Sequence, residues 1–351
     1  MHKFVTRIIT HNTIKKFPSS PGITLCQIRH ADNDSVKEKY TKVAVFRKYW
    51  FSRYLDYIKN YEKTLEKNFP KTMHVYRVFS VGTKDFYVEL KKFLLIKKKL
   101  NIDGEHSLSR QELEINQTMP RDLLKISPVL LISAIPFTNY IIFPLAYFFP
   151  RHLLTYHYWS LQQRLDFLLI EHKKRLKHNK PLFRCMQAQV HQIKNRELKR
   201  KWRDIIACLG SGTHPTTSNI IACIELFTAP PYSLSSLKRK HIKELLAIHG
   251  MNKWCFNRKS RLLDRGLLIK EMDDAIRKEG GVTKMHNDAL KWALSFRGVN
   301  PVNMSVEGMQ DWLEKWLEVS CMIDENSISL LLHCPILLAY NHETNWILLY
   351  H

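Results

Sequence analysis

The sequence lacks the short motifs by which many enzymes and metal-binding domains are recognised. GxSxG, HExxH and GxGxxG are absent, and GSGTHP at 210–215 lacks the GK[ST] ending of a phosphate-binding loop. The adjacent acids Asp273 and Asp274 offer no catalytic pair on a helix, because neighbouring helical side chains point about 100° apart. We therefore expect a protein that is not an enzyme and has no cofactor or resident metal.

Cysteine and glycine usage excludes further classes. The seven cysteines form no CxxC pair, and their spacing is typical of reduced, packed thiols rather than of disulfides or a zinc site. Only 11 of the 351 residues are glycine and 45% are hydrophobic, which argues against a collagen-like chain or long disordered segments. The length leaves room for two domains, or for one domain with a membrane segment and a tail.

Acidic residues are few in most of the chain. The formal net charge is +23, and residues 301–351, with seven acids and one lysine, carry −6, which leaves +29 on residues 1–300. Such an excess favours an anionic partner such as nucleic acid, a ribosome or anionic lipid, the alternative being a generally basic protein. The candidate contacts lie in three basic runs: Lys173, Lys174, Arg175 and Lys177; Lys199, Arg200, Lys201 and Arg203; Lys238, Arg239 and Lys240.

No acid precedes Asp32. Residues 1–31 contain five bases and two adjacent serines, and the apolar residues at 4, 5, 8 and 9 share one helical face. This pattern, without the longer apolar core of a secretory signal, predicts a mitochondrial targeting segment, and an ordinary basic tail is the alternative.

No charged residue occurs from 127 to 150, in the run SPVLLISAIPFTNYIIFPLAYFFP. A continuous helix of that length would extend about 36 Å, enough to cross a hydrocarbon core of about 30 Å, and we expect a single transmembrane helix. Basic residues do not settle its orientation, because residues 96–125 hold six and residues 151–180 hold seven. The residues that mark the predicted span are Ser127, Pro136, Asn139, Pro144 and Pro150.

The rest of the chain predicts helices, and no persuasive β alternation is present. Helices over 36–68 and 73–100 make residues 36–125 a helical amino-terminal region, and residues 152–340 form a helical domain. A helix over 283–296 should end at Gly298 in the left-handed conformation, and Ser305 should cap the helix that follows. The fold class is therefore all-α.

Several motifs of the carboxyl half occur in the order found in a known family. Two run together in the centre of the domain, Asp273-Asp274-Ala275-Ile276 followed by Glu279-Gly280. The others are Leu237 to Leu246, Arg258 with Leu262, Arg297-Gly298-Val299, Trp316-Leu317-Glu318-Val319-Ser320 and Ser329-Leu330-Leu331-Leu332, with Pro136-Phe137 and Phe149-Pro150 upstream.

On these residues the chain, over about 73–340, resembles the leucine-zipper/EF-hand-containing transmembrane proteins of mitochondria. It has no EF-hand loop or leucine zipper, so it is most similar to the short members that keep the LETM domain. The resemblance implies a single-pass protein of the mitochondrial inner membrane. Its helical domain, with a 14-3-3-like fold, would face the matrix and bind ribosomes or respiratory-chain assembly partners. The nucleic acid that it contacts would be the rRNA of the ribosome.

The resemblance also implies an association with potassium/proton or calcium/proton exchange. Asn139 stands where long members of the family carry an acid, so the predicted span has no ionisable side chain of the kind that relays cations or protons. We therefore expect a non-enzymatic adaptor rather than an exchanger. A scaffold acting through protein contacts, an outer-membrane location and a homo-oligomer are the open alternatives.

Overall fold

The computed structural model describes residues 70–103, 108–133, 135 and 138–350. The predicted targeting segment (1–31) and the predicted helix over 36–68 lie outside these residues. The part of the chain that is described contains α-helices and short 3-10 helices and no strand, which confirms the all-α prediction. The chain divides into two compact units, Met1–His74 and Val75–His351, and the second holds every described element apart from the first residues of α2.

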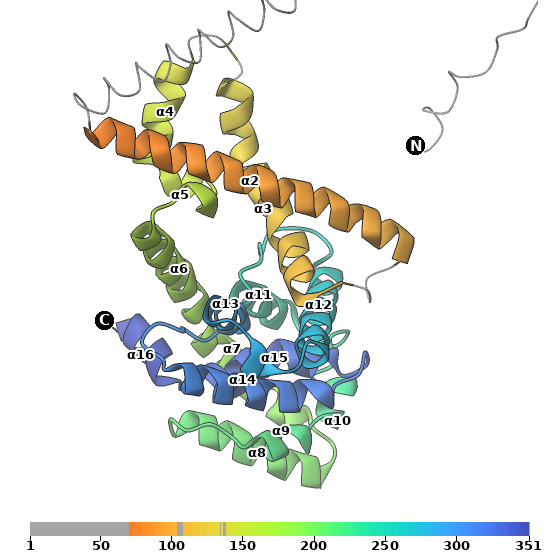
Figure 1. Cartoon of the computed structure of the whole chain (residues 1–351). Helices are drawn as coiled ribbons and strands as arrows, with labels where there is room; N and C mark the ends of the chain where they lie inside the picture. The colour runs from red at the N-terminus through yellow and green to blue at the C-terminus, as the bar shows by residue number, and fades with distance from the viewer. Residues whose placement is uncertain (1–69, 104–107, 134, 136–137, 351) are drawn as a thin grey trace, which may run out of the picture. The chain divides into compact units, whose positions relative to one another are not determined.

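The helices follow one another with short connections (Figure 1). In the first half they are α2 (Pro70–Asp103), α3 (Arg110–Ser133), α4 (Asn139–Phe148), α5 (Pro150–Leu153), η2 (Tyr156–Tyr158), α6 (Leu161–Leu176), α7 (Asn179–Gln187) and η3 (Val190–Gln192). In the second half they are α8 (Arg196–Gly210), α9 (Thr217–Ile221), α10 (Glu225–Thr228), α11 (Arg239–Ile248), α12 (Arg258–Lys278), η4 (Val282–Lys284), α13 (Asn287–Arg297), α14 (Val306–Cys321), α15 (Ile328–Ala339) and α16 (Glu343–Tyr350).

Helix α15 is the centre of the main core. All twelve of its residues are buried, as expected for a helix that is apolar on every face. Helices α7, α10, α11, α12 and α14 all pack against it. Gly266 of α12 lets the two helices approach closely, because a Cβ at this position would lie 2.7 Å from Cγ1 of Ile328.

Local signals set several helix ends as the sequence predicts. Helix α13 ends at Gly298, which is left-handed with φ of 102°, and the Ser305 side chain accepts a hydrogen bond from the amide of Gly308 to cap α14. Helix α2 covers the predicted helix over 73–100. The six described cysteines form no disulfide with one another. Only Cys223 and Cys334 are buried, and Cys255 and Cys321 are exposed, so the predicted packing holds for two of them.

The uncharged run at 127–150 is not one continuous helix, so that part of the prediction is wrong. Helix α3 ends at Ser133, α4 occupies only Asn139–Phe148, and the chain then leaves the helical conformation at Phe149, where φ is −121° and ψ is 52°. Proline disfavours the helical conformation in the residue before it, and Phe149 precedes Pro150. Among the described residues, no helix is both long enough and apolar enough to cross a membrane.

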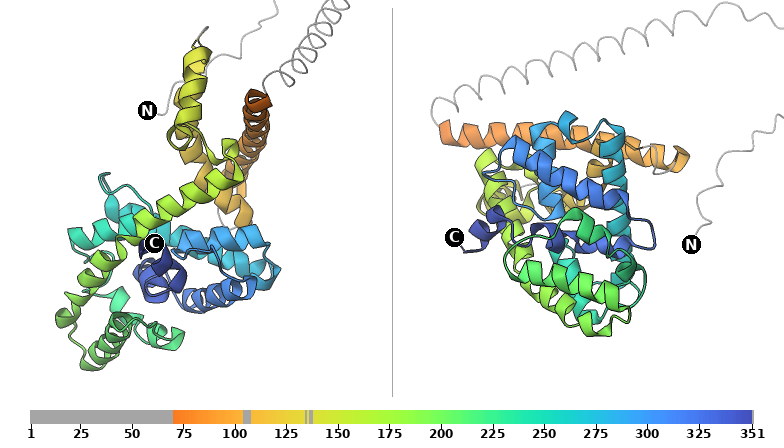
Figure 2. Two further views of the ribbon diagram at one scale, coloured as in Figure 1. Left: turned by 90° about the vertical axis from the view of Figure 1, so that its left-hand side faces the viewer. Right: turned by 90° about the horizontal axis from the view of Figure 1, so that it is seen from below.

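Helices α3 and α4 lie side by side and project from one end of the unit, with α2 crossing beside them (Figures 1 and 2). Helix α8 lies at the opposite end in Figure 1 and in the left-hand view of Figure 2. A small core joins the projecting helices to the chain on both sides of the uncharged run. It contains Phe86, Phe93, Met119, Ile126, Ala146, Leu154 and Tyr158.

A chain of hydrogen bonds between neutral side chains crosses the main core between α11 and α15. His333 Nδ1 donates to the backbone oxygen of Ser329 at 2.6 Å, so its Nε2 accepts from Nε2 of His241 at 2.7 Å. His241 Nδ1 in turn accepts from the Gln189 amide at 3.3 Å. Each tautomer is thus determined by its neighbour. Burial lowers the pKa of His241 to about 2 and that of His333 to about 4.

We predict that the protein loses stability in mild acid because of its buried histidines. Burial also lowers the pKa of His172 and of His249 to about 3, against 6.5 for the free side chain. Below about pH 6.5 the unfolded chain binds protons at these histidines and the folded chain does not. Each histidine therefore lowers the free energy of unfolding by about 1.4 kcal/mol for each pH unit below that value, and it has no such effect at higher pH. Denaturant unfolding of the detergent-solubilised chain at pH 7.5, 6.5 and 5.5 measures this loss. The exposed-site variant His191→Gln should show the same dependence, and a pH-independent unfolding free energy would contradict the prediction.

Candidate anion-binding surface

The predicted basic contacts lie on three helices. Lys173, Lys174 and Lys177 lie at the end of α6, Lys199 to Arg203 on α8, and Lys238 to Lys240 at the start of α11. Lys174, Lys177, Arg200 and Arg203 are exposed, as are all three bases at 238–240. Within the α8 run, the Trp202 side chain is fully buried, and its Nε1 donates to the Tyr232 hydroxyl at 2.9 Å.

Some of these charges are already paired within the chain. Lys201 Nζ lies 2.8 Å from a Glu197 carboxylate oxygen, and Lys174 Nζ lies 3.5 Å from Glu171. Lys199 donates to the backbone oxygen of His191 at 3.2 Å. The α6 and α8 groups therefore offer fewer uncommitted charges than the sequence suggests.

The start of α11 is joined by a base from α7. Arg184, Lys238 and Lys240 line one cavity of about 180 Å³, and none of its described lining residues is acidic. Helices α7 and α11 pack directly together, which brings Arg184 to residues more than fifty positions later in the chain. Arg184 was not predicted, because an isolated exposed arginine has no signal in the sequence.

Two aromatic side chains extend from the loop between α11 and α12. Trp254 is 80% exposed and Phe256 is 93% exposed, both high for large apolar residues. They line an open hollow of about 450 Å³ together with Arg258 and Lys259. The Nζ atom of Lys243, on α11, lies 5.6 Å from the centre of the Trp254 ring, which is within cation–π range.

We call this region the basic–aromatic surface: Arg184, Lys238, Lys240, Lys243, Trp254, Phe256, Arg258 and Lys259. It combines guanidinium and ammonium groups, which neutralise phosphates, with exposed rings on which bases or arginines can stack. The alternation of aromatic and basic residues in NKWCFNRKSR (252–261) was the available sequence signal for its second half.

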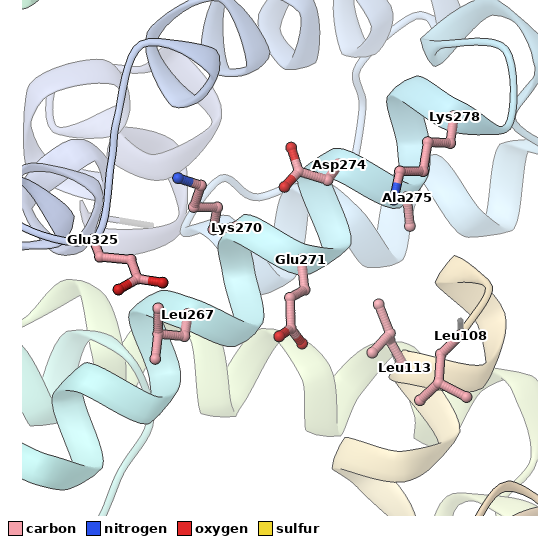
Figure 3. A pocket seen from close by; sticks show the side chains of 9 residues that line it. All are labelled: Leu108, Leu113, Leu267, Lys270, Glu271, Asp274, Ala275, Lys278 and Glu325. Carbon is pink, nitrogen blue, oxygen red and sulfur yellow. The ribbon is translucent and has the colours of Figure 1, made fainter. Parts of the chain in front are cut away.

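A cavity at the junction of α3 and α12 has a different character. Leu108 and Leu113 face Ala275 across it, and charges of both signs surround the remaining wall (Figure 3). Its volume is about 140 Å³. Because Lys270 and Lys278 share this wall with Glu271, Asp274 and Glu325, it has no excess of positive charge to attract an anion.

Arg175 does not belong to a binding surface, and its prediction as a contact is wrong. Its guanidinium donates to three backbone oxygens, those of Ile248 at 2.6 Å, Ser295 at 2.8 Å and Phe296 at 3.1 Å. These carbonyls belong to the last turns of α11 and α13, where carbonyls lack helical partners and attract cations. Arg175 therefore joins the ends of two helices, and burial, with the nearby charge of Arg121, lowers its pKa to about 10.

A second internal network centres on Asp273. One carboxylate oxygen accepts from Arg297 Nε at 3.1 Å and from its Nη2 at 2.5 Å, and the other accepts from Trp316 Nε1 at 3.0 Å and the Ser320 hydroxyl at 2.5 Å. All four side chains are fully or almost fully buried. The carboxylate thus links α12, α13 and α14, and each of its lone-pair directions is used within the core.

A protein-family model described as "LETM1-like, RBD" matches residues 108–337 of the chain. The chain belongs to the LETM1-like family. The family prediction made from the motifs is therefore confirmed.

Named relatives support the same membership. The chain is 33% identical over 286 residues to "LETM1 domain-containing protein 1" of Xenopus tropicalis, covering 80% of this chain and 81% of the relative. It is 30% identical over 287 residues to the Homo sapiens protein of the same name, covering 80% and 79%. No solved structure matches the chain, so the 14-3-3-like fold stays a prediction.

The LETM1-like motif positions are mainly structural in this chain. Glu279 accepts from the amide of Arg110 at 2.7 Å, which ties the end of α12 to the start of α3. Gly280 is left-handed with φ of 104°, and Leu317 is buried in the main core beside Trp316. Asp274 is only partly buried and pairs with Arg277, so the two adjacent acids have separate environments, as helical geometry predicts.

We predict that Arg175→Met destabilises the fold, whereas Lys177→Met does not. Arg175→Met leaves three carbonyls of two helix ends without a donor, and we expect a loss of about 2–4 kcal/mol. Lys177 is exposed, and substitutions of exposed side chains usually change stability by less than about 0.5 kcal/mol. Denaturant unfolding of both variants measures the difference. Equal stabilities would contradict the internal role of Arg175.

We predict an equally sharp contrast between neighbouring acids. Asp273→Asn removes the charge that balances the buried Arg297 and should cost about 3–5 kcal/mol. Asp274→Asn affects a partly exposed pair at the helix surface and should cost about 0.5 kcal/mol or less. Thermal melts of the two variants beside the parent chain provide the test. A melt of the Asp273 variant that matches the parent would show that the network contributes little.

Proposed function

We propose that this protein is a non-enzymatic adaptor of the mitochondrial inner membrane that docks on ribosomes through its helical unit. The basic–aromatic surface carries the proposal, because the exposed rings of Trp254 and Phe256 occur there together with the exposed bases Arg184, Lys238 and Lys240. The family description supports it, since RBD denotes a ribosome-binding domain. The mitochondrial location rests on the acid-free segment 1–31, and the membrane attachment rests on the uncharged run at 127–150.

The proposed docking combines two kinds of contact. Arg184, Lys238 and Lys240 would neutralise phosphates, which releases counterions and makes binding depend strongly on salt. Trp254 and Phe256 would stack on unpaired bases or on arginine side chains of ribosomal proteins, a contact that depends little on salt. The bases of α8, at the end of the unit farthest from α3 and α4, are the second candidate surface (Figure 1).

Cation/proton exchange is disfavoured by the same observations. The uncharged run has no acidic or basic side chain, and the Asn139 amide, at the first position of α4, does not ionise at neutral pH. Exchange therefore has no relay within this segment. A scaffold that works only through protein contacts is the alternative, and the binding measurement separates it from ribosome docking.

We predict that the full chain in detergent micelles co-sediments with mitochondrial ribosomes at low salt. The logarithm of affinity should fall linearly with the logarithm of salt, with a slope of about −0.7 to −0.9 per phosphate neutralised. Replacing Arg184, Lys238 and Lys240 by Gln should reduce that slope by about two to three units. Replacing Trp254 and Phe256 by Ala should weaken binding while leaving the slope unchanged.

The matched control replaces Lys199, Arg200 and Arg203 of α8 by Gln, which removes the same number of charges. A larger slope change in this control would move the docking site to α8. A folded chain that never co-sediments at low salt would refute ribosome docking and favour the protein-scaffold alternative.

A further inference from the structure

The residues before and after the uncharged run are held together by direct contacts. Glu89 of α2 accepts from the Tyr156 hydroxyl at 2.6 Å, and its other carboxylate oxygen lies 3.0 Å from His157 Nε2. On the far side of the unit, the amide of Arg110 donates to Glu279 at 2.7 Å. Residues 89 and 110 precede the run, and residues 156, 157 and 279 follow it.

Two apolar clusters join the same flanks. In the first, Phe86, Phe93 and Met119 share a core with Leu154 and Tyr158. In the second, Ile96, Leu108 and Leu113 pack with Met272 and Ala275 of α12. A bilayer crossed once at 127–150 would have to lie between the members of each cluster. The packed core of these helices excludes that arrangement, so both flanks lie on one side of any membrane that the run enters.

The helices of the run have the dimensions of a hairpin that enters one leaflet. Helix α4 has 10 residues, and the uncharged end of α3, from Ser127 to Ser133, has 7. At 1.5 Å per residue these lengths are about 15 Å and about 10 Å, which is half or less of a hydrocarbon core of about 30 Å. Large apolar side chains point outward along both helices, with Leu131 70% exposed and Phe148 73% exposed.

Two described backbone carbonyls near the turn of the hairpin, those of Ile132 and Ile135, have hydrogen-bond partners within the chain. The Thr138 hydroxyl lies 2.7 Å from the backbone oxygen of Ile135 and 2.5 Å from that of Ile132, and the Ile135 amide donates to Ile132 at 3.1 Å. These bonds serve carbonyls at the end of α3, where the helix leaves them without partners. Hydrocarbon provides no hydrogen bonds, so internal partners of this kind are required of backbone that turns within lipid.

Positive charge lies only at the base of the hairpin. Lys125 precedes the run and Arg151 follows it, with Arg121 one turn earlier on α3, and Lys125 Nζ lies 4.4 Å from the centre of the Trp159 ring. A base and an indole at this position suit the headgroup region. The similar basic counts of the two flanks, which give no orientation for a single crossing, agree with two flanks on the same face.

We propose that residues 127–150 insert into one leaflet as a helical hairpin and return, so that the segments before and after them stay on the same face of the membrane. This inference rests on the proposed membrane attachment and replaces the single crossing. The partner of the exposed apolar faces of α3 and α4 is therefore the acyl region of one leaflet.

One introduced cysteine on each flank of the run tests whether the two flanks lie on the same face of the membrane. The test does not require the orientation of the protein in the vesicles to be known. In the full chain, Cys26, Cys185, Cys208, Cys255 and Cys321 are replaced by Ser and the buried Cys223 and Cys334 are kept. Lys98→Cys and Lys177→Cys, both at exposed positions, then place one thiol before the run and one after it. The protein is reconstituted into phosphatidylcholine/phosphatidylglycerol vesicles, treated with a membrane-impermeant maleimide polymer, and quenched before the tags on each molecule are counted on a gel.

The hairpin predicts molecules with two tags or none, whatever the orientation in the vesicles. A single crossing predicts one tag on every molecule, and that result would overturn the proposal alone. The control pair Lys84→Cys with Lys98→Cys lies entirely before the run and should give two tags or none in either topology. A chain that carbonate at high pH removes from the vesicles would instead refute the proposed membrane attachment, and the hairpin with it.

Discussion

The fold depends on the complete burial of α15. A helix that is apolar on every face must be covered on every side, and α7, α10, α11, α12 and α14 provide this cover. Two backbone oxygens of this helix accept hydrogen bonds from side chains outside it: Leu332 from His249 and Leu338 from Trp312. Because burying a polar group without a partner costs free energy, these polar contacts restrict how the surrounding helices can be arranged.

Local signals in the sequence predicted the helix positions, ends and caps that depend only on residues nearby in the chain. The period of apolar residues predicted α14, Gly298 predicted the end of α13, and Ser305 predicted a cap, because each acts within a few residues. Arg175 could not be placed in this way. Its carbonyl partners are more than seventy positions away, so within the run HKKRLKHNK it has the same appearance as the exposed lysines around it.

The prediction of one continuous helix over 127–150 was wrong for a related reason. Its composition is that of a membrane segment, but composition does not distinguish one long helix from two short helices that lie side by side. That distinction comes from the end of α3 at Ser133 and the separate start of α4 at Asn139, and from the contacts of Glu89 and Arg110 with later residues. Similarly, the family motifs at Asp273, Arg297 and Trp316 lie in one buried network, whereas the residues suited to binding lie on the surface.

The depth of the α3–α4 hairpin has a mechanical consequence. Two helices that end near the middle of a bilayer would add cross-sectional area to one leaflet and none to the other. The membrane relieves such an imbalance by bending away from the side that carries the extra area, so the protein would act as a wedge and prefer strongly curved membrane to flat membrane. The 34-residue α2, which crosses beside the hairpin, would then orient the wedge relative to the rest of the unit (Figure 2).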